Sequence, residues 1–206
     1  MTARTLAVVS AGLSQPSSTR LLADRLATAT GTSLGELGFT PAVEVVELRD
    51  LAHDLTDNLL TGFPSPRLES AIETVVGADG LIAVTPIFTA SYSGLFKTFF
   101  DVLEPQSLTG KPVLLGATAG TARHSLALEH ALRPLFAYLR AVTVPTAVFA
   151  ASEDWGAGDS PAGRALAERI ARAGGELADL MAVERRKPSA DPLSTLTPFE
   201  QLLSGN

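Results

Sequence analysis

The chain has 206 residues, 46% of them hydrophobic, and a net charge of −6 at pH 7. This is the size of one large domain with enough apolar residues for a full core. The acidic balance, without any long run of Lys or Arg, argues against nucleic-acid binding. The sequence contains no cysteine, which excludes disulfides, thiolate nucleophiles and Cys-ligated zinc or iron–sulfur clusters.

Targeting and membrane signals are not evident in the sequence. The apolar run at residues 6–9 leads directly into a Ser-rich turn and is too short for a signal-peptide core. No run approaches the roughly 20 apolar residues that cross a bilayer. We therefore expect a cytoplasmic protein with no membrane partner. The basic run at residues 185–187 closes an expected helix, where cations favour the C-terminal end of the helix dipole.

Five short runs rich in Val, Ile and Leu are predicted to be β-strands. The first, third and fourth are almost continuously apolar, which is typical of parallel strands covered on both faces by helices. The predicted strands cover residues 6–10, 43–48, 81–85, 113–117 and 144–149.

Segments with helical spacing of apolar residues lie between and after these strands. Pro66 is suited to the first turn of a helix, and Pro105 is expected to end another. Gly174 and Gly175 predict a kink in the middle of the last helix. The predicted helices cover residues 18–29, 66–76, 93–103, 122–140 and 161–184.

The alternation of strands and helices predicts an α/β fold, a three-layer doubly wound sandwich with a five-stranded parallel sheet in the order 2-1-3-4-5. We expect residues 1–186 to form a single domain and residues 187–206 to form a C-terminal arm or tail. In such a sheet, ligands bind at the carboxyl ends of the strands beside the switch point between strands 1 and 3. The loops after strands 1, 3 and 4 are therefore the expected site.

The first of these loops, residues 10–19, brings hydroxyls and free backbone N–H groups to a helix N-terminus, a combination that binds phosphate. The alternative is that Ser17 or Ser18 only caps the helix. The loop has neither the GK[ST] ending of a Walker loop nor the GxGxxG dinucleotide fingerprint. A phosphomonoester held by hydroxyls and amides fits it better.

The other two loops are suited to a flat ligand. Residues 85–94 combine Pro, aromatic and small hydroxyl residues with Gly, although an ordinary strand-to-helix turn capped by Ser93 is also possible. Residues 116–124 are mostly small, which allows the backbone to approach a ring. His124 either contacts the ligand or serves as a capping or packing residue.

Two stretches resemble the NAD(P)H-dependent FMN reductase family, close to the two-component reductases that supply reduced flavin to monooxygenases. They are TPIFTASYSGLFKTFFDVLEP at residues 85–105 and GATAGTARHSLALEHALRPLFAYLRA at residues 116–141. The ASYSG-x-x-K pattern is similar to that of a member used in sulfonate utilisation. The resemblance runs from Leu6 to about Phe149, weakens over residues 31–65, and implies a flavodoxin-like fold.

The resemblance implies that FMN binds and that NADPH or NADH is the hydride donor. Around the FMN phosphate it implies Ser10, Ser17, Ser18 and Thr19. Around the isoalloxazine it implies Pro86, Ile87, Phe88, Thr89, Ala90, Ser91, Thr118, Ala119 and Gly120. The position of His124 in the third loop makes it a further candidate, for the phosphate or the ring edge. Family members often carry an arginine in the first loop, where this sequence has Leu13 and Ser14. A lower phosphate affinity would suit a flavin that leaves as product.

The resemblance also bears on assembly. In the sulfonate-type reductases an inserted tyrosine produces a π-type turn at a tetramer interface, and we transfer this role to Tyr92. The aromatic residues Phe96, Phe99 and Phe100 are expected in the core. They also exceed what one helix face usually buries, which adds to the expectation of a homodimer or homotetramer.

The implied chemistry requires few special side chains, because hydride transfer between stacked rings depends on positioning. We therefore expect no catalytic side chain and no metal site, and we expect His53 and His130 to lie on the surface. Arg20, Lys97 and Arg123 are each candidates for binding the 2′-phosphate of NADPH. The choice between NADPH and NADH stays open.

Other functions remain possible from sequence. A quinone or azo reductase would retain FMN as a prosthetic group, whereas a flavodoxin-type electron carrier would lack nicotinamide activity. A binding module would have no flavin affinity. The final electron acceptor, a possible monooxygenase partner and the choice between dimer and tetramer also stay open.

Overall fold

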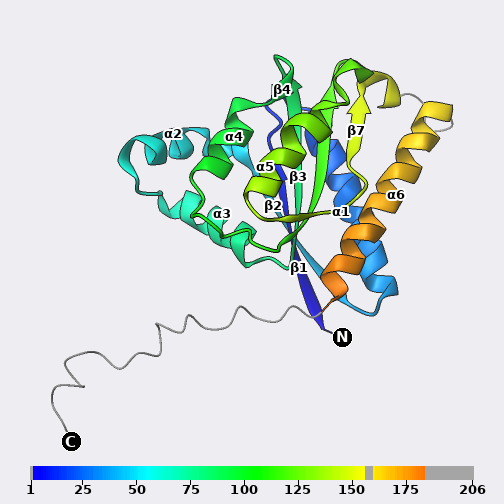
Figure 1. The fold of residues 1–206 in the computed structure, drawn as a ribbon, viewed down its shortest axis with the longest axis horizontal. Helices are drawn as coiled ribbons and strands as arrows, with labels where there is room; N and C mark the ends of the chain where they lie inside the picture. The colour runs from blue at the N-terminus through cyan, green and yellow to red at the C-terminus, as the bar shows by residue number, and fades with distance from the viewer. Residues whose placement is uncertain (1, 156–159, 184–206) are drawn as a thin grey trace, which may run out of the picture.

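The computed structural model describes residues 2–155 and 160–183 and shows a central sheet with helices on both faces (Figure 1). The sheet has the order β2-β1-β3-β5-β6, so the predicted parallel arrangement is confirmed, with seven strands in the described residues instead of five. Its long parallel strands are β1 (Ala3–Ser10), β2 (Thr40–Glu47), β3 (Gly80–Phe88) and β5 (Pro112–Ala119).

The predicted fifth strand is divided into β6 (Val142–Thr143) and β7 (Val148–Ala151), both of which pair with β5. Pro145 lies in the interruption and has no N–H to donate to a sheet ladder. The Arg133 guanidinium donates instead to the carbonyl oxygens of Val144 and Pro145, at 3.1 and 3.2 Å. The prediction of one continuous strand over 144–149 was therefore wrong.

The helices form the two outer layers and enclose a separate apolar core on each face of the sheet. On one face are α1 (Ser18–Glu36) and α6 (Pro161–Ala182). On the other face are α2 (Ala52–Thr61), α3 (Pro66–Gly77), α4 (Gly94–Asp101) and α5 (Arg133–Tyr138).

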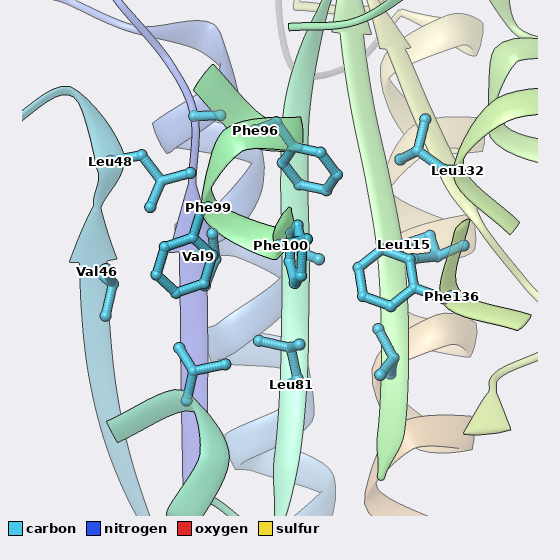
Figure 2. Packing of buried hydrophobic residues seen from close by; sticks show 14 of the residues in the cluster. Val9, Val46, Leu48, Leu81, Phe96, Phe99, Phe100, Leu115, Leu132 and Phe136 are labelled. Atoms are coloured by element: carbon cyan, nitrogen blue, oxygen red, sulfur yellow. The ribbon is translucent and has the colours of Figure 1, made fainter. Parts of the chain in front are cut away.

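The second core is centred on aromatic residues of α4 and α5 (Figure 2). The ring centroids of Phe96 and Phe100 are 4.8 Å apart, and those of Phe100 and Phe136 are 4.9 Å apart. Phe96 and Phe99 are fully buried within the chain. The aromatic cluster is thus explained by packing against its own sheet, and it no longer supports a subunit interface.

Helices α1 and α6 pack closely where Gly174 faces α1. A Cβ at Gly174 would come within 2.8 Å of the Ala29 Cβ and the Thr30 backbone nitrogen. Helix α6 continues without interruption through Gly174 and Gly175. The missing side chain permits close contact between two helices.

Three helical segments differ from the sequence-based expectation. The α2 helix and the preceding 3₁₀ turn η1 (Leu48–Leu51) were not predicted. The single helix expected over residues 122–140 is divided into the 3₁₀ turn η2 (Ala122–His124), the π-helical turn η3 (Leu128–Leu132) and α5. Pro134 accounts for the wide turn, because its ring would crowd the carbonyl group four residues earlier in a regular α-helix.

Candidate functional site

A cavity of about 310 Å³ lies at the carboxyl ends of β1, β3 and β5. This is the edge of the sheet at which doubly wound folds bind ligands, and the volume is at the lower end of the range for small-molecule sites. All the lining residues are uncharged. They are Leu13, Ser14, Ser18, Thr19, Pro86, Ile87, Phe88, Thr118, Ala119, Gly120 and Ser152.

The loop after β1 folds tightly against the start of α1. A Cβ at Gly12 would come within 2.1 Å of Ser17 Oγ and 3.1 Å of Thr19 Cβ, so the loop requires a residue without a side chain there. Ser17 caps α1 by accepting a hydrogen bond from the Arg20 N–H at 3.2 Å. The capping alternative for Ser17 is therefore what the structure shows.

Several polar groups of this loop have no partner in the part of the chain that the structure describes. Ser10 Oγ is buried and makes no hydrogen bond. The backbone N–H groups of Ser18 and Thr19, at the first turn of α1, donate to no described acceptor. Unpaired N–H groups at the positive end of a 19-residue helix favour an anionic ligand.

A hydrogen bond between two buried hydroxyls joins the first and third loops. Thr19 Oγ1 and Thr118 Oγ1 are 2.8 Å apart, and each residue is only 3% exposed. The two residues lie 99 positions apart in the sequence, so this bond fixes the position of α1 relative to the end of β5. Both side chains also line the cavity.

The segment after β3 reverses direction in a tight hairpin. Thr89 and Ala90 have φ angles of 48° and 72°, and β4 (Ser91–Tyr92) pairs antiparallel with the end of β3. A left-handed conformation at a non-glycine residue costs on the order of 1 kcal/mol. The hairpin therefore depends on the contacts at its base.

Thr85 makes the contacts at the base of the hairpin. Its hydroxyl donates to the carbonyl oxygen of Pro86 at 2.9 Å and accepts from the Ser93 N–H at 3.0 Å. Ser93 in turn caps α4 by accepting from the Phe96 N–H at 3.2 Å. This arrangement directs Phe88, which is 46% exposed, to the cavity.

The structure brings eight of the sequence-predicted site residues into the cavity. They are Ser18, Thr19, Pro86, Ile87, Phe88, Thr118, Ala119 and Gly120. Sequence reasoning did not propose Leu13, Ser14 or Ser152 as site residues. Ser152 follows β7, the last strand of the sheet, whereas the site was expected only at the ends of strands 1, 3 and 4.

The remaining predicted contacts do not line the cavity. Ser10 lies buried at the end of β1, and Ser17 lines a neighbouring cavity. Thr89, Ala90 and Ser91 form the hairpin, and His124 is exposed in η2.

Tyr92 is half-buried in β4, with its ring centroid 5.9 Å from that of Phe96. The π-helical turn expected there is found instead at η3, which contains His130. The transfer of a π-type turn to Tyr92 was therefore wrong. Both His53 of α2 and His130 lie at least partly at the surface.

The neighbouring cavity, about 510 Å³, lies on the other side of the first loop and contains charged groups. Its arginines are paired, Arg20 with Asp24 and Glu47 at 2.7 and 2.5 Å, and Arg49 with Asp50 at 3.4 Å. The hydrogen bonds that the Arg20 guanidinium donates to the Asp24 and Glu47 carboxylates raise the pKa of Arg20 above its ordinary value. This cavity therefore offers little free positive charge.

Similarity to known proteins agrees with this arrangement. Residues 4–156 match the family model described as NADPH-dependent FMN reductase. The chain belongs to the NADPH-dependent FMN reductase family. It is thus an oxidoreductase whose family combines FMN with NADPH or NADH.

Relatives in the FMN reductase family are similar over most of the chain. An FMN reductase (NADPH) of Pseudomonas aeruginosa is 37% identical over 149 residues, which cover 71% of this chain and 76% of that protein. The NADH-dependent FMN reductase SfnF of Pseudomonas putida is 38% identical over 146 residues, covering 71% and 76%. The two names specify different donors.

Solved structures of oxidoreductases share this fold. An oxidoreductase from Corynebacterium diphtheriae is 49% identical, with a TM-score of 0.86 over 90% of this chain and 100% of that one. The apo form of the NADH:FMN oxidoreductase EMOB is 26% identical, with a TM-score of 0.71 over 92% of each chain.

Among the helices of the described residues, none combines the length and the apolar composition of a membrane-spanning helix.

Proposed function

We propose that this family member reduces FMN with a nicotinamide nucleotide in the cavity at the strand ends and then releases the reduced FMN to a partner monooxygenase. The observation that supports exchange of the flavin is the lack of charged residues in the cavity lining. A phosphate bound only by hydroxyls and N–H groups is held less strongly than one paired with Arg or Lys. FMN is therefore proposed to be a substrate and not a permanently bound group.

The first loop is proposed to bind the FMN phosphate. Ser18 supplies its hydroxyl and N–H group, and Thr19 supplies its N–H group, while Ser14 lies at the same wall of the cavity. The unpartnered hydroxyl of Ser10 and the close packing at Gly12 agree with a loop shaped around an anion. A phosphomonoester is small enough to be bound within this one turn.

The second and third loops are proposed to bind the flavin ring. Pro86, Ile87 and Phe88 present an apolar surface, and Ala119 and Gly120 allow the backbone close to the ring edge. Leu13 and Phe88, 52% and 46% exposed, would lose contact with water when a ring and a donor lie between them.

The chemistry requires positioning more than proton transfer. Bound FMN supplies a ring that accepts a hydride directly from the nicotinamide. The chain orients the two rings and excludes water, which is enough to bring the reacting atoms together. No side chain of the cavity is assigned a catalytic proton, and the lining contains hydroxyls but neither a carboxylate nor a histidine.

The test combines purification with titration and kinetics. We expect a colourless protein that oxidises NADPH or NADH when FMN is added, with a flavin Kd of micromolar order in a fluorescence titration. FAD and riboflavin, run in parallel, measure the contribution of the phosphate. Reduced FMN should also support a flavin-dependent monooxygenase that is separated by a dialysis membrane.

Three outcomes would contradict the proposal. A yellow protein that keeps FMN through gel filtration and reduces quinones or azo compounds without added flavin would be the prosthetic-group reductase. A protein that binds FMN but oxidises neither NADPH nor NADH would be an electron carrier. A protein with no affinity for any flavin would be a binding module.

Assembly and location are part of the same proposal. A homodimer or homotetramer is supported by the exposed apolar side chains at the end of α2, where Leu60 and Phe63 are 82% and 80% exposed. Light scattering after size-exclusion chromatography measures the mass, and a monomer would contradict this.

A cytoplasmic location fits the use of nicotinamide nucleotides. The proposed single domain of residues 1–186 and the arm at residues 187–206 extend beyond the described residues.

A further inference from the structure

Positive charge near the cavity decides whether the extra phosphate of NADPH can be recognised. NADPH and NADH differ only in a 2′-phosphate on the adenosine ribose, and proteins bind that group with Arg or Lys. The cavity lining contains neither residue. Recognition must therefore come from the rim, where Arg20, Lys97 and Arg123 lie close in sequence to the three loops.

Two of these cations are already paired. The Arg20 guanidinium contacts Asp24 and Glu47 at 2.7 and 2.5 Å, and the Lys97 ammonium group contacts Asp101 one helical turn away. A phosphate approaching either cation would also approach the carboxylates. Their positive charge is largely compensated before a donor arrives.

Arg123 differs from both in its environment. It lies in η2, three residues after Gly120 of the cavity, and its side chain is exposed. The Thr121 hydroxyl accepts from the Arg123 N–H at 3.1 Å and fixes the backbone of the turn. Across residues 2–155 and 160–183, the Arg123 guanidinium makes no ion pair or hydrogen bond.

The surroundings of η2 increase the need for this cation. The end of β7 lies beside η2 and leads into the 3₁₀ turn η4 (Ser152–Trp155), which carries Glu153 and Asp154. Asp154 accepts a hydrogen bond from the Ala151 N–H at 2.8 Å. His124 is the other titratable residue of η2. The Glu153 and Asp154 carboxylates would repel the phosphates of a donor, and Arg123 on η2 and Arg25, which stacks on Trp155 of η4, are cations that offset them.

We propose that Arg123 binds the 2′-phosphate of NADPH and thereby makes the protein prefer NADPH to NADH. The inference rests on the proposed function, since it concerns the donor of the same reaction. Arginine is suited to this role because its guanidinium stays charged and forms paired hydrogen bonds with phosphate. The preference is a property of one exposed side chain and not of the cavity.

The kinetic test uses Arg123→Gln with Arg172→Gln as the control, because Arg172 is an exposed arginine in the middle of α6. We expect wild type to have a higher kcat/KM for NADPH than for NADH. Arg123→Gln should lower kcat/KM for NADPH by about 10- to 100-fold, mainly through KM, and change the NADH value less than about twofold. The control should retain the wild-type ratio.

A binding test separates this inference from the activity itself. Titration calorimetry with adenosine 2′,5′-bisphosphate and with AMP needs no flavin and no turnover. We expect the bisphosphate to bind wild type more tightly, and Arg123→Gln to remove that difference. Raising the salt concentration should weaken bisphosphate binding more than AMP binding.

Three results would overturn the assignment of Arg123: a wild type that uses NADH as well as NADPH, a variant in which both donors lose activity equally, or equal binding of the two nucleotides by wild type. Failure of wild type to oxidise either donor with FMN would instead contradict the proposed function. In that case the calorimetric comparison still decides whether Arg123 binds the 2′-phosphate.

Discussion

The loops after β1 and β3 contribute to the same cavity but use their polar groups in opposite ways. At the end of β3 and in the segment that follows, the Thr85 hydroxyl both donates and accepts a hydrogen bond and Ser93 caps α4. After β1, the hydroxyl of Ser10 and the N–H groups of Ser18 and Thr19 have no partner in the described residues. One loop is complete by itself, whereas the other is incomplete without a ligand.

This difference assigns a different task to each loop. A loop with satisfied hydrogen bonds and two strained turn residues is rigid and suited to support a flat ring. A loop with unpaired N–H donors at a helix N-terminus gains most from an anion, because these donors and the helix dipole both favour negative charge. Changes to the first loop should therefore affect FMN more than riboflavin, while changes to the second should affect both flavins alike.

Gly12→Ala should have the largest effect, because the new Cβ would overlap Ser17 Oγ at 2.1 Å and press on Thr19. We expect FMN affinity to fall by about 100-fold as the loop shifts. Fluorescence titration measures this loss. Gly35→Ala is the matched control, since nothing lies within 4 Å of its added Cβ, and it should leave FMN affinity unchanged. Equal affinity in both variants would show that the loop is not shaped around the phosphate.

Thr85→Val should rank second. Removing the hydroxyl leaves the buried Ser93 N–H without its acceptor, which costs about 2 kcal/mol of unfolding free energy. Denaturant unfolding measures the stability, and titrations with FMN and riboflavin should weaken by similar factors. A loss confined to FMN would contradict the distinction between the two loops.

Ser18→Ala should have a smaller effect on flavin affinity, and only for a flavin that carries a phosphate. Loss of one hydroxyl donor to a phosphate should weaken FMN binding by about tenfold and leave riboflavin binding unchanged. Ser70→Ala, an exposed position on α3, is the control. If Ser18→Ala weakens riboflavin equally, Ser18 does not contact the phosphate.

Glu129→Gln should have the smallest effect and should spare both loops. The hydrogen bond from Arg133 lowers the pKa of Glu129 below its ordinary value of 4.5, and the ion pair is 2.6 Å long. A carboxylate with a lowered pKa stabilises the folded state above its ordinary pKa, and this contribution is lost as the pH falls through the folded-state pKa. We expect a loss of about 0.3–0.5 kcal/mol at pH 7, because the pair is largely exposed.

Thermal unfolding at a series of pH values checks this last prediction. The difference between Glu129→Gln and wild type should shrink as the pH is lowered below 4.5. A difference that stays constant with pH would mean that the carboxylate charge is not its cause. FMN affinity should not change at pH 7.

The sheet and the site could be predicted from sequence where one physical signal dominated. Buried parallel strands such as β5 are continuous apolar runs, and the order of the sheet follows from their alternation with helices. The loops at the strand ends followed from that order. Ser152 was not predicted because the site was expected only in the loops after strands 1, 3 and 4, whereas Ser152 follows the last strand of the sheet.

Other features depend on contacts that a single sequence does not display. A glycine such as Gly174 looks the same in the sequence whether it bends a helix or permits close packing against another helix. Its packing role becomes visible only from its closeness to Ala29 of α1 in the structure. The hairpin at Thr89 and Ala90 uses left-handed residues that lack the usual Asn-Gly signature. By contrast, leucines at 51, 55 and 59 have a helical spacing that runs from the end of η1 into α2, so the sequence does contain a signal for α2.

The hydrogen bond between Thr19 and Thr118 connects the proposed phosphate site at the start of α1 to the proposed ring site at the end of β5. An anion that orders the start of α1 also orders the end of β5 through this hydrogen bond. The flavin ring then binds to residues that are already ordered, so its binding costs less conformational entropy. Inorganic phosphate and riboflavin should therefore bind cooperatively, so that each raises the affinity of the protein for the other. A Thr19→Val chain should bind the two fragments independently.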